Sequence, residues 1–430
     1  MKIGIVSLGC SKNLVDTEYA MRFLVRQGHE FVPDPRDADA IIINTCGFIN
    51  DAKEESINTI LEMADYKHEK CRKLIVMGCL ATRYHDELVE EIPEVDRFIT
   101  INEYDHLDQI FRDLLKSKED IECDLVLATK PWTAYLKIAD GCNNMCAFCA
   151  IPLIRGRYKS RTMEDIVENA RQLADKGVKE LNLIAQDTTK YGLDLYGRCC
   201  LDELLTRLNE LDFHWIRVLY MYPDELSDKL IETMGRLDKV VPYFDIPSQH
   251  GSDRLLKKMR RLSDVERLHA IIKKIRASFA DPVLRTTIIV GFPSETAEDF
   301  RKLCDFVSEA RWDRLGGFTY SLEEDTEAYD IHPRISHRVA ESRYRKVMQI
   351  QQQISQENNS RYLNTVQEVL VEEVDAFGKR YRGRSYHFAP DDIDGYISFT
   401  STEQLEPGTF VKVRITSVSN YNWKGEAINK

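Results

Sequence analysis

The 430-residue sequence lacks any long hydrophobic run, which limits the classes of protein it can belong to. No apolar stretch approaches the roughly 18 residues that a membrane helix needs, so we expect no membrane span. The opening MKIGIVSLG carries no basic leader and no small-residue cleavage site, so we expect no signal peptide. The expected absence of an export signal and the odd count of 11 cysteines together predict a cytoplasmic protein. Its thiols should serve metals or catalysis rather than disulfides.

The sequence also lacks a basic excess, having 59 Lys and Arg against 71 Asp and Glu for a net charge of -12. Proteins that bind nucleic acid usually gather Lys and Arg to neutralise phosphates. The balance therefore disfavours nucleic acid, including tRNA, as the main partner, although it leaves a local basic patch open. The length and the 43% hydrophobic and 30% charged residues are typical of a globular protein of about two to four domains.

Three cysteines, Cys142, Cys146 and Cys149, stand three and then two residues apart in GCNNMCAFCAIP. Three such thiolates can each bind one iron of a cuboidal cluster, but they cannot close a four-ligand site by themselves. No Cys or His follows within the next few dozen residues to complete a tetrahedral zinc site. The pattern therefore predicts an iron–sulfur cluster with one open iron, against the alternatives of incidental loop cysteines or part of a zinc site.

This spacing resembles the loop of the radical S-adenosylmethionine (SAM) enzymes, which holds a 4Fe-4S cluster while SAM chelates the fourth iron. The resemblance implies that Cys142, Cys146 and Cys149 hold such a cluster and form the catalytic centre.

Residues 1–125 alternate short apolar runs with helical patterns, which predicts a Rossmann-like parallel sheet covered on both faces. The three apolar runs end at Cys10, Cys46 and Cys79. Because the carboxyl ends of parallel strands meet at one edge, we expect these thiols to converge on a second cluster. Packing is the alternative for any one of them, since free cysteine is among the most buried residue types. The remaining cysteines show no pattern and are interpreted as structural or incidental: Cys71, Cys123, Cys199, Cys200 and Cys304.

The helical patterns of this part cover residues 15–27, residues 52–64 and a stretch that begins near Glu87.

The run SLGCSKNLVDTE, three spread cysteines and then the radical SAM loop resemble the methylthiotransferases, over the whole length of the chain. The resemblance implies two 4Fe-4S clusters, SAM, and insertion of a methylthio group at an unactivated C–H bond. SLGCSKNLVDTE and IPSQHGSD resemble the branch that modifies the β-carbon of an aspartate in small-subunit ribosomal protein twelve. The tRNA branch typically has GCQMN with DSE, and Gln-Ser-Gly-Ser. Ser248 departs from the Leu expected by this resemblance.

In such enzymes the cluster of the radical SAM loop receives an electron from a reductant such as flavodoxin or ferredoxin and cleaves SAM to a 5'-deoxyadenosyl radical. The second cluster offers its open iron to a sulfur atom, which a second SAM methylates. Two rival functions stay open: a tRNA adenosine methylthiotransferase, and a non-catalytic iron–sulfur or RNA-binding scaffold.

Residues 130–362 contain six apolar runs separated by helical patterns, which predicts an open, partial (βα)6 barrel with its working edge at the strand carboxyl ends. By this rule we expect Gln186, Asp187 and Gly291 to contact SAM or orient the substrate, with ordinary turn chemistry as the alternative. Gln249, His250 and the rest of 291–295 should rim the same cavity. The strand candidates are residues 133–142, 179–187, 215–223, 241–249, 284–292 and 314–321.

Two further segments of this part carry predictions. The basic run of Lys257, Lys258, Arg260 and Arg261 is interpreted as a solvated helix face. Residues 338–360 should form a long polar helix, with Val347, Ile350 and Ile354 on one stripe, that joins the barrel to the last domain.

Residues 363–430 predict a small all-β barrel with strands at 366–374, 394–400 and 408–418. Its position and size resemble a TRAM domain, a module that often binds RNA. From Val366 onward it has eight Lys and Arg against ten Asp and Glu. A barrel of this charge is a poor phosphate binder, and we expect it to dock a basic ribosomal protein.

Overall fold

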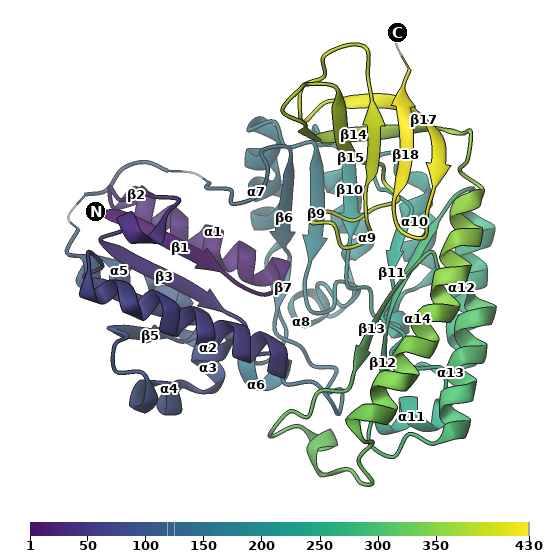
Figure 1. Ribbon diagram of the computed structural model, residues 1–430, viewed down its shortest axis with the longest axis horizontal. Helices are drawn as coiled ribbons and strands as arrows, with labels where there is room; N and C mark the ends of the chain where they lie inside the picture. The colour runs from purple at the N-terminus through teal and green to yellow at the C-terminus, as the bar shows by residue number, and fades with distance from the viewer. Residues whose placement is uncertain (118, 124, 429–430) are drawn as a thin grey trace.

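The computed structural model describes residues 1–117, 119–123 and 125–428. Its strands form a five-stranded parallel sheet, two three-stranded parallel sheets that together make an open barrel, and a closed five-stranded barrel (Figure 1). This confirms the predicted α/β fold class with a small β-barrel in the last part of the chain.

The first sheet has the strand order β2-β1-β3-β4-β5, with all pairs parallel. Every residue of the central strand AIIINT is buried, as expected when helices cover both faces. The elements are β1 Lys2–Ser7, α1 Ser11–Arg26, β2 Glu30–Phe31, β3 Ala40–Thr45, α2 Asn50–Asp65, β4 Lys73–Gly78, α3 Cys79–Arg83, α4 His85–Glu91, β5 Arg97–Ile99 and α5 Leu107–Leu115. Helices α1 and α5 pack on one face, and α2, α3 and α4 on the other.

Four helices and strands of this part were not predicted, and three predicted helices start earlier than expected. Helix α1 begins at Ser11 with Cys10 at its N-cap position, and α2 begins at Asn50. The helical stretch expected near Glu87 is α4, which begins at His85 and follows the separate, unpredicted helix α3. Strands β2 and β5 are only two and three residues long, too short for a periodic signal. The sequence of helix α5 does contain a periodic signal, because its buried residues Leu107, Phe111 and Leu115 are four positions apart.

The second part contains all six predicted strands, each paired in parallel with its neighbours. A bridge between Ile216 and Val240 connects the two three-stranded sheets into one open barrel. All six strands end earlier than predicted, the third at Val218 and the fourth at Asp245. Beyond those two ends, Tyr220 and Gln249 adopt left-handed backbone angles, with φ of 59° and 70°, which do not belong to a strand. The strands are β6 Thr133–Lys137, β7 Ala139–Asp140, β8 Lys159–Ser160, β9 Glu180–Ile184, β10 Trp215–Val218, β11 Tyr243–Asp245, β12 Val283–Val290 and β13 Arg314–Thr319.

The barrel helices are α6 Ile151–Arg155, α7 Met163–Asp175, α8 Leu193–Tyr196, α9 Leu201–Leu208, α10 Asp228–Arg236, α11 Asp253–Lys258, α12 Val265–Ser278, α13 Ala297–Ala310 and α14 His337–Ser360. Short 3-10 turns lie at Pro35–Asp37, Tyr66–His68, Ile101–His106, Pro223–Glu225 and Glu327–Asp330. The predicted polar helix at 338–360 is α14, and its stripe of Val347, Ile350 and Ile354 packs against the barrel.

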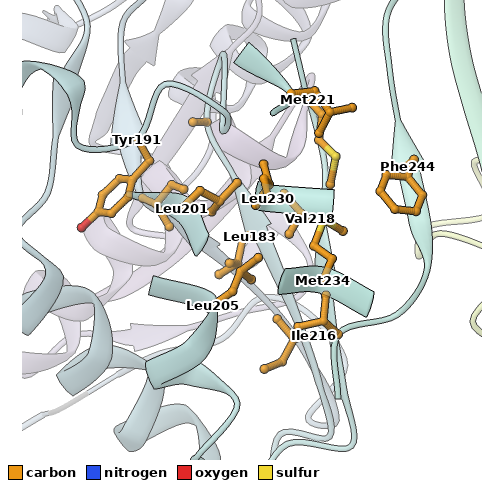
Figure 2. Close-up of a cluster of buried hydrophobic side chains, with 14 of the residues drawn as sticks. Leu183, Tyr191, Leu201, Leu205, Ile216, Val218, Met221, Leu230, Met234 and Phe244 are labelled. Carbon is orange, nitrogen blue, oxygen red and sulfur yellow. The ribbon is translucent and has the colours of Figure 1, made fainter. Parts of the chain in front are cut away.

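The barrel core lies between its strands and the outer helices (Figure 2). Leu183, Ile216 and Val218 belong to this apolar layer together with Leu205 of α9 and Met234 of α10. The intervening strand positions are polar yet fully buried, as the exposed fractions of Glu180, Asn182 and Arg217 are all 0%. The inside of the barrel therefore holds buried polar groups beside a second apolar cluster that includes Tyr135 and Tyr243.

The closed barrel has the order β14-β15-β16-β18-β17. Its strands are β14 Val366–Val374, β15 Arg380–Arg384, β16 Ile397–Thr400, β17 Phe410–Val418 and β18 Trp423–Ala427. The sequence predicted β14, β16 and β17. It did not predict β15 and β18, because RYRGR and WKGEA contain charges and a glycine in place of the usual β-branched residues.

The closed barrel covers the amino-terminal ends of the open barrel's strands, which lie at the top in Figure 1. Glu180, the first residue of β9, accepts hydrogen bonds from Arg217 at 3.1 Å and from Arg384 of β15 at 2.6 Å. Burial by itself would raise the pKa of Glu180, but the two guanidinium groups lower it to about 2. The residue is therefore an ionised carboxylate that joins the two barrels.

Replacing this carboxylate should cost much of the stability. We expect Glu180→Gln to lower the free energy of unfolding at pH 7 by about 3–5 kcal/mol, because it leaves two guanidinium groups buried without a charged partner. The native pKa lies below the ordinary 4.5, so the contribution of Glu180 is complete above pH 4.5 and is lost as the pH falls toward 2. Denaturant unfolding at several pH values should show the difference from wild type shrinking over that range.

Glu368→Gln is the matched control, since Glu368 pairs with His214 and Lys412 at the same interface but is only partly buried. It should cost less than about 1 kcal/mol. Equal losses in the two variants would contradict a dominant role for the buried carboxylate.

Candidate metal and cofactor site

The structure brings together the carboxyl ends of the three strands that precede Cys10, Cys46 and Cys79, because β1, β3 and β4 are neighbours in the sheet. Cys10 occupies the N-cap position of α1 without a capping bond from its thiol, Cys46 follows β3, and Cys79 is the first residue of α3. These positions are those that the strand pattern predicted.

Two glycines allow the three cysteine loops to touch. Gly9 has a φ of 88°, and a Cβ at this position would lie 2.7 Å from the Cβ of Cys46. A Cβ on Gly47 would lie 2.9 Å from the backbone nitrogen of Leu80, the residue after Cys79. Real Cβ atoms do not approach so closely, so any larger residue at either position would push the cysteine loops apart.

Asn13 connects these strand ends through its side chain. Its amide nitrogen donates to the carbonyl oxygens of Leu8 at 3.1 Å and Thr45 at 2.9 Å, which fixes the ends of β1 and β3. Its amide oxygen lies 3.4 Å from the sulfur of Cys79. Asn13 belongs to the SKN signature, but the sequence alone gave no reason to assign it this role.

The loop of Cys142, Cys146 and Cys149 follows β6 at the carboxyl edge of the open barrel. Its base is closed by the antiparallel pair of β7 and β8 and by a hydrogen bond from the nitrogen of Cys142 to the oxygen of Gly156, at 3.1 Å. All three cysteines are partly exposed. The loop is therefore held at its base, while each of its three cysteine residues keeps some exposed surface.

The predicted SAM contacts lie near this loop in different surroundings. Asp187 is fully buried and accepts hydrogen bonds from Asn144 of the cluster loop at 2.8 Å and from the Thr189 hydroxyl at 2.6 Å. The side-chain oxygen of Gln186 is buried without a hydrogen-bond partner among the described residues, which suits a donor on a bound ligand. Contacts of either residue with SAM stay predictions.

Gly291 has a packing reason to be glycine that the sequence did not indicate. A Cβ there would lie 2.6 Å from the Cβ of Ala340, so the glycine lets α14 approach the barrel. Glu295 accepts a hydrogen bond from the nitrogen of Gly291 and lies 3.4 Å from His250, inside the protein. The expected contact of Gly291 with SAM stays a prediction.

The predicted solvated face at residues 257–261 is wrong for Arg261. Helix α11 ends at Lys258, and Arg260 turns the chain with a φ of 55°, so that Arg261 is only 8% exposed. Its guanidinium lies 3.8 Å from the ring centroid of Tyr222 and 3.8 Å from the sulfur of Cys146. The basic run in the sequence does not indicate that one of its residues, Arg261, is buried.

Ser248, which departs from the expected Leu, is also buried. Its hydroxyl lies 2.8 Å from the hydroxyl of Thr286, so the polar group has a partner in the barrel.

The segments that carry the two cysteine sets meet at the contact between α3 and α6. Cys79 belongs to a small apolar cluster with Ala150, the residue after Cys149, and with Ile154 of α6. A metal centre at either set would therefore lie against the protein that surrounds the other.

Arg155 is the polar centre of this contact. It donates hydrogen bonds to Asn13 at 2.7 Å, Asp16 at 2.8 Å and Asp140 at 3.0 Å, and its Nη2 lies 3.6 Å from the sulfur of Cys79. Lys137 also pairs with both aspartates, and the side chain of Arg155 is only 1% exposed. We name Asp16, Lys137, Asp140 and Arg155 the buried ion network.

Burial raises the pKa of the Cys79 thiol to about 12 and that of the Cys142 thiol to about 11, and it also raises those of Cys46 and Cys149. The positive charge of Arg155 acts in the opposite direction on Cys79. At neutral pH these four metal-free thiols therefore keep their protons, and iron binding must release them.

Among the described residues, no three His, Cys, Asp or Glu side chains are placed to hold a single metal ion. Each set offers three thiols, and each thiolate of a cuboidal cluster binds a different iron atom. Both cysteine sets therefore fit a 4Fe-4S cluster by donor type and number.

Comparisons with known families divide the chain into three matched regions. Residues 2–100 match "Uncharacterized protein family UPF0004", residues 136–307 the Radical SAM superfamily and residues 365–428 the TRAM domain.

Two full-length relatives carry the same name. A protein of Acetivibrio thermocellus named "Ribosomal protein uS12 methylthiotransferase RimO" is 47% identical over 448 residues, covering 100% of this chain and 99% of the relative. A protein of Alkaliphilus oremlandii with the same name is 48% identical over 433 residues, covering 99% of each.

Among solved structures, the radical SAM methyltransferase TsrM from Kitasatospora setae has a TM-score of 0.54 at 13% identity, covering 74% of each chain. At this identity the likeness concerns the fold alone.

The buried ion network should be essential to the fold around the cysteines. We expect Arg155→Gln to lower the free energy of unfolding of the iron-free protein by about 3–5 kcal/mol, since it removes one partner of a buried pair. Arg157→Gln is the matched control, because Arg157 is exposed and has no recorded ion pair among the described residues. It should change stability by about 0.5 kcal/mol or less. Denaturant unfolding of both variants measures this, and similar small losses would show that the network is dispensable.

Proposed function

Because this chain belongs to the ribosomal protein uS12 methylthiotransferase RimO family, we propose that it methylthiolates ribosomal protein uS12 at the β-carbon of an aspartate. The observation that supports this best is that Cys79 of one three-cysteine set packs against Ala150, the residue after Cys149 of the other set. An enzyme that activates a carbon and then delivers sulfur to it needs both centres close to one substrate.

The radical SAM region implies SAM and a 4Fe-4S cluster. We assign this cluster to Cys142, Cys146 and Cys149, and a second 4Fe-4S cluster to Cys10, Cys46 and Cys79. When bound, these groups supply the radical that removes hydrogen from carbon and the sulfur that replaces it. The chain supplies binding, orientation and exclusion of water.

Several side chains have roles of this kind. The unpartnered oxygen of Gln186 is available to a donor of SAM, Asp187 orients the cluster loop through Asn144, and the backbone at Gly291 completes the rim. Arg261 places a positive charge beside Cys146. Because the closed barrel covers the other end of the strands, we expect substrate and SAM to enter at the carboxyl edge.

The remaining parts of the proposal concern partners and organisation. We propose a reductant such as flavodoxin or ferredoxin as electron donor, a cytoplasmic location, and domains at residues 1–125, 130–362 and 363–430. Within the described part of the chain, no helix is both long and apolar enough to cross a membrane.

Iron content tests the two sites directly. We expect the anaerobically reconstituted protein to hold about eight irons, and the triple variant Cys142→Ala, Cys146→Ala, Cys149→Ala about half, because each cluster has its own ligands. The triple variant Cys123→Ala, Cys199→Ala, Cys304→Ala is the control and should keep about eight. A central variant that holds no iron would contradict two independent sites.

The division of roles is tested with purified uS12 and tRNA as substrates. Wild type should methylthiolate an aspartate of uS12, as read by mass spectrometry. The triple variant Cys10→Ala, Cys46→Ala, Cys79→Ala should still form 5'-deoxyadenosine from SAM but leave uS12 unmodified. Methylthio product from this variant would remove the sulfur role of the first set. Methylthiolated adenosine in tRNA with unmodified uS12 would replace the proposed function by its tRNA rival.

A further inference from the structure

A groove of about 810 Å³ lies where helices α2, α3 and α4 meet the segment that follows β13. This volume is within the range of known ligand sites. Two of its apolar side chains, Ile57 and Leu61 of α2, are 37% and 49% exposed, so the groove offers apolar surface to a partner. Its apolar lining consists of Ile57, Leu61, Leu80, Leu88, Ile92 and Leu322.

The groove adjoins the reaction centre proposed above. Its wall includes Leu80, the residue that follows Cys79. Near that wall, Lys53 and Arg83 pair with Glu323 at 3.0 Å and 2.6 Å, which connects the helices of the first sheet to the segment after β13. The groove is thus formed by both parts of the protein, beside the segment that carries Cys79.

The rim of the groove is negatively charged. Glu54, Glu87, Glu91 and Glu324 line it and are exposed, and no ion pair of theirs is recorded among the described residues. The lysine in the lining, Lys53, is already paired with Glu323. The rim therefore carries negative charge that a basic partner would neutralise.

We propose that this acidic groove docks a basic segment of the ribosomal-protein substrate, with an apolar side chain on its floor and Lys or Arg at its rim. The proposal rests on the proposed function. A protein that packs against ribosomal RNA carries the basic residues that phosphate contacts require, so its charge is opposite to that of the rim. The phosphates of tRNA would meet the same carboxylates and be repelled.

The test compares two double variants that remove equal charge from the same two helices. Glu54→Gln with Glu91→Gln removes carboxylates from the groove, whereas Glu62→Gln with Glu90→Gln removes exposed carboxylates of α2 and α4 that do not line it. With purified uS12 at low salt, the groove variant should raise KM roughly threefold to tenfold, with the change on KM rather than kcat. The control should keep the wild-type KM. Iron content verifies that both variants fold.

Salt and an apolar pair of variants give independent readouts. The KM difference should vanish near 1 M salt, where the Debye length is about 3 Å. Leu61→Ala should also raise KM, whereas Val89→Ala, equally exposed at 49% but outside the groove, should not.

Unchanged KM in the groove variants, or equal rises in the controls, would overturn the docking role while the proposed function stands. Wild-type protein that leaves uS12 unmodified would remove the proposed function itself, and the docking role with it.

Discussion

The buried pairing of Asp16 with Arg155 is the constraint on which the site depends. Asp16 lies six residues after Cys10 on α1, and Arg155 lies six residues after Cys149 on α6. One ion pair therefore links the segments that follow the two cysteine sets, and Lys137 and Asp140 complete the charge balance. A buried charge that loses its partner is costly, so the two segments are held in a single arrangement. The same guanidinium reaches the sulfur of Cys79 and so couples the geometry of the contact to the chemistry of the thiols.

A second group of buried charges lies at the end of the open barrel opposite to the cysteine loop. Glu180, Arg217 and Arg384 join the closed barrel to the amino-terminal ends of the strands, while both cysteine sets lie at carboxyl ends. Strands of about five residues separate these ends by roughly 16 Å. The closed barrel therefore covers one end of the open barrel. The expectation that it docks the ribosomal protein stays a prediction. The acidic groove lies nearer to the cysteines and was not foreseen.

Much of the fold could be predicted because its signals are local. Apolar runs such as AIIINT mark buried strands, and six of them in alternation with helices indicate the open barrel. The strands that the sequence did not predict were missed for equally local reasons. Strand β5 has only three residues, and β15 consists mostly of arginines, which are not typical of a strand. Arg384 sits in that strand only because Glu180, some two hundred residues earlier, neutralises it. No window of sequence contains both partners of such a pair.

The same distinction separates what the sequence by itself determined about the site from what only the tertiary structure decided. Cys142, Cys146 and Cys149 are close in the chain, and Cys10, Cys46 and Cys79 follow successive parallel strands, so spacing and topology suffice to group them. Asn13, Arg155 and Arg261 are different, because an isolated polar residue has the same local pattern whether it meets solvent or a buried thiol. Folding decided their roles, by bringing a partner from a distant segment to each of them and by excluding the water that would otherwise screen their charges.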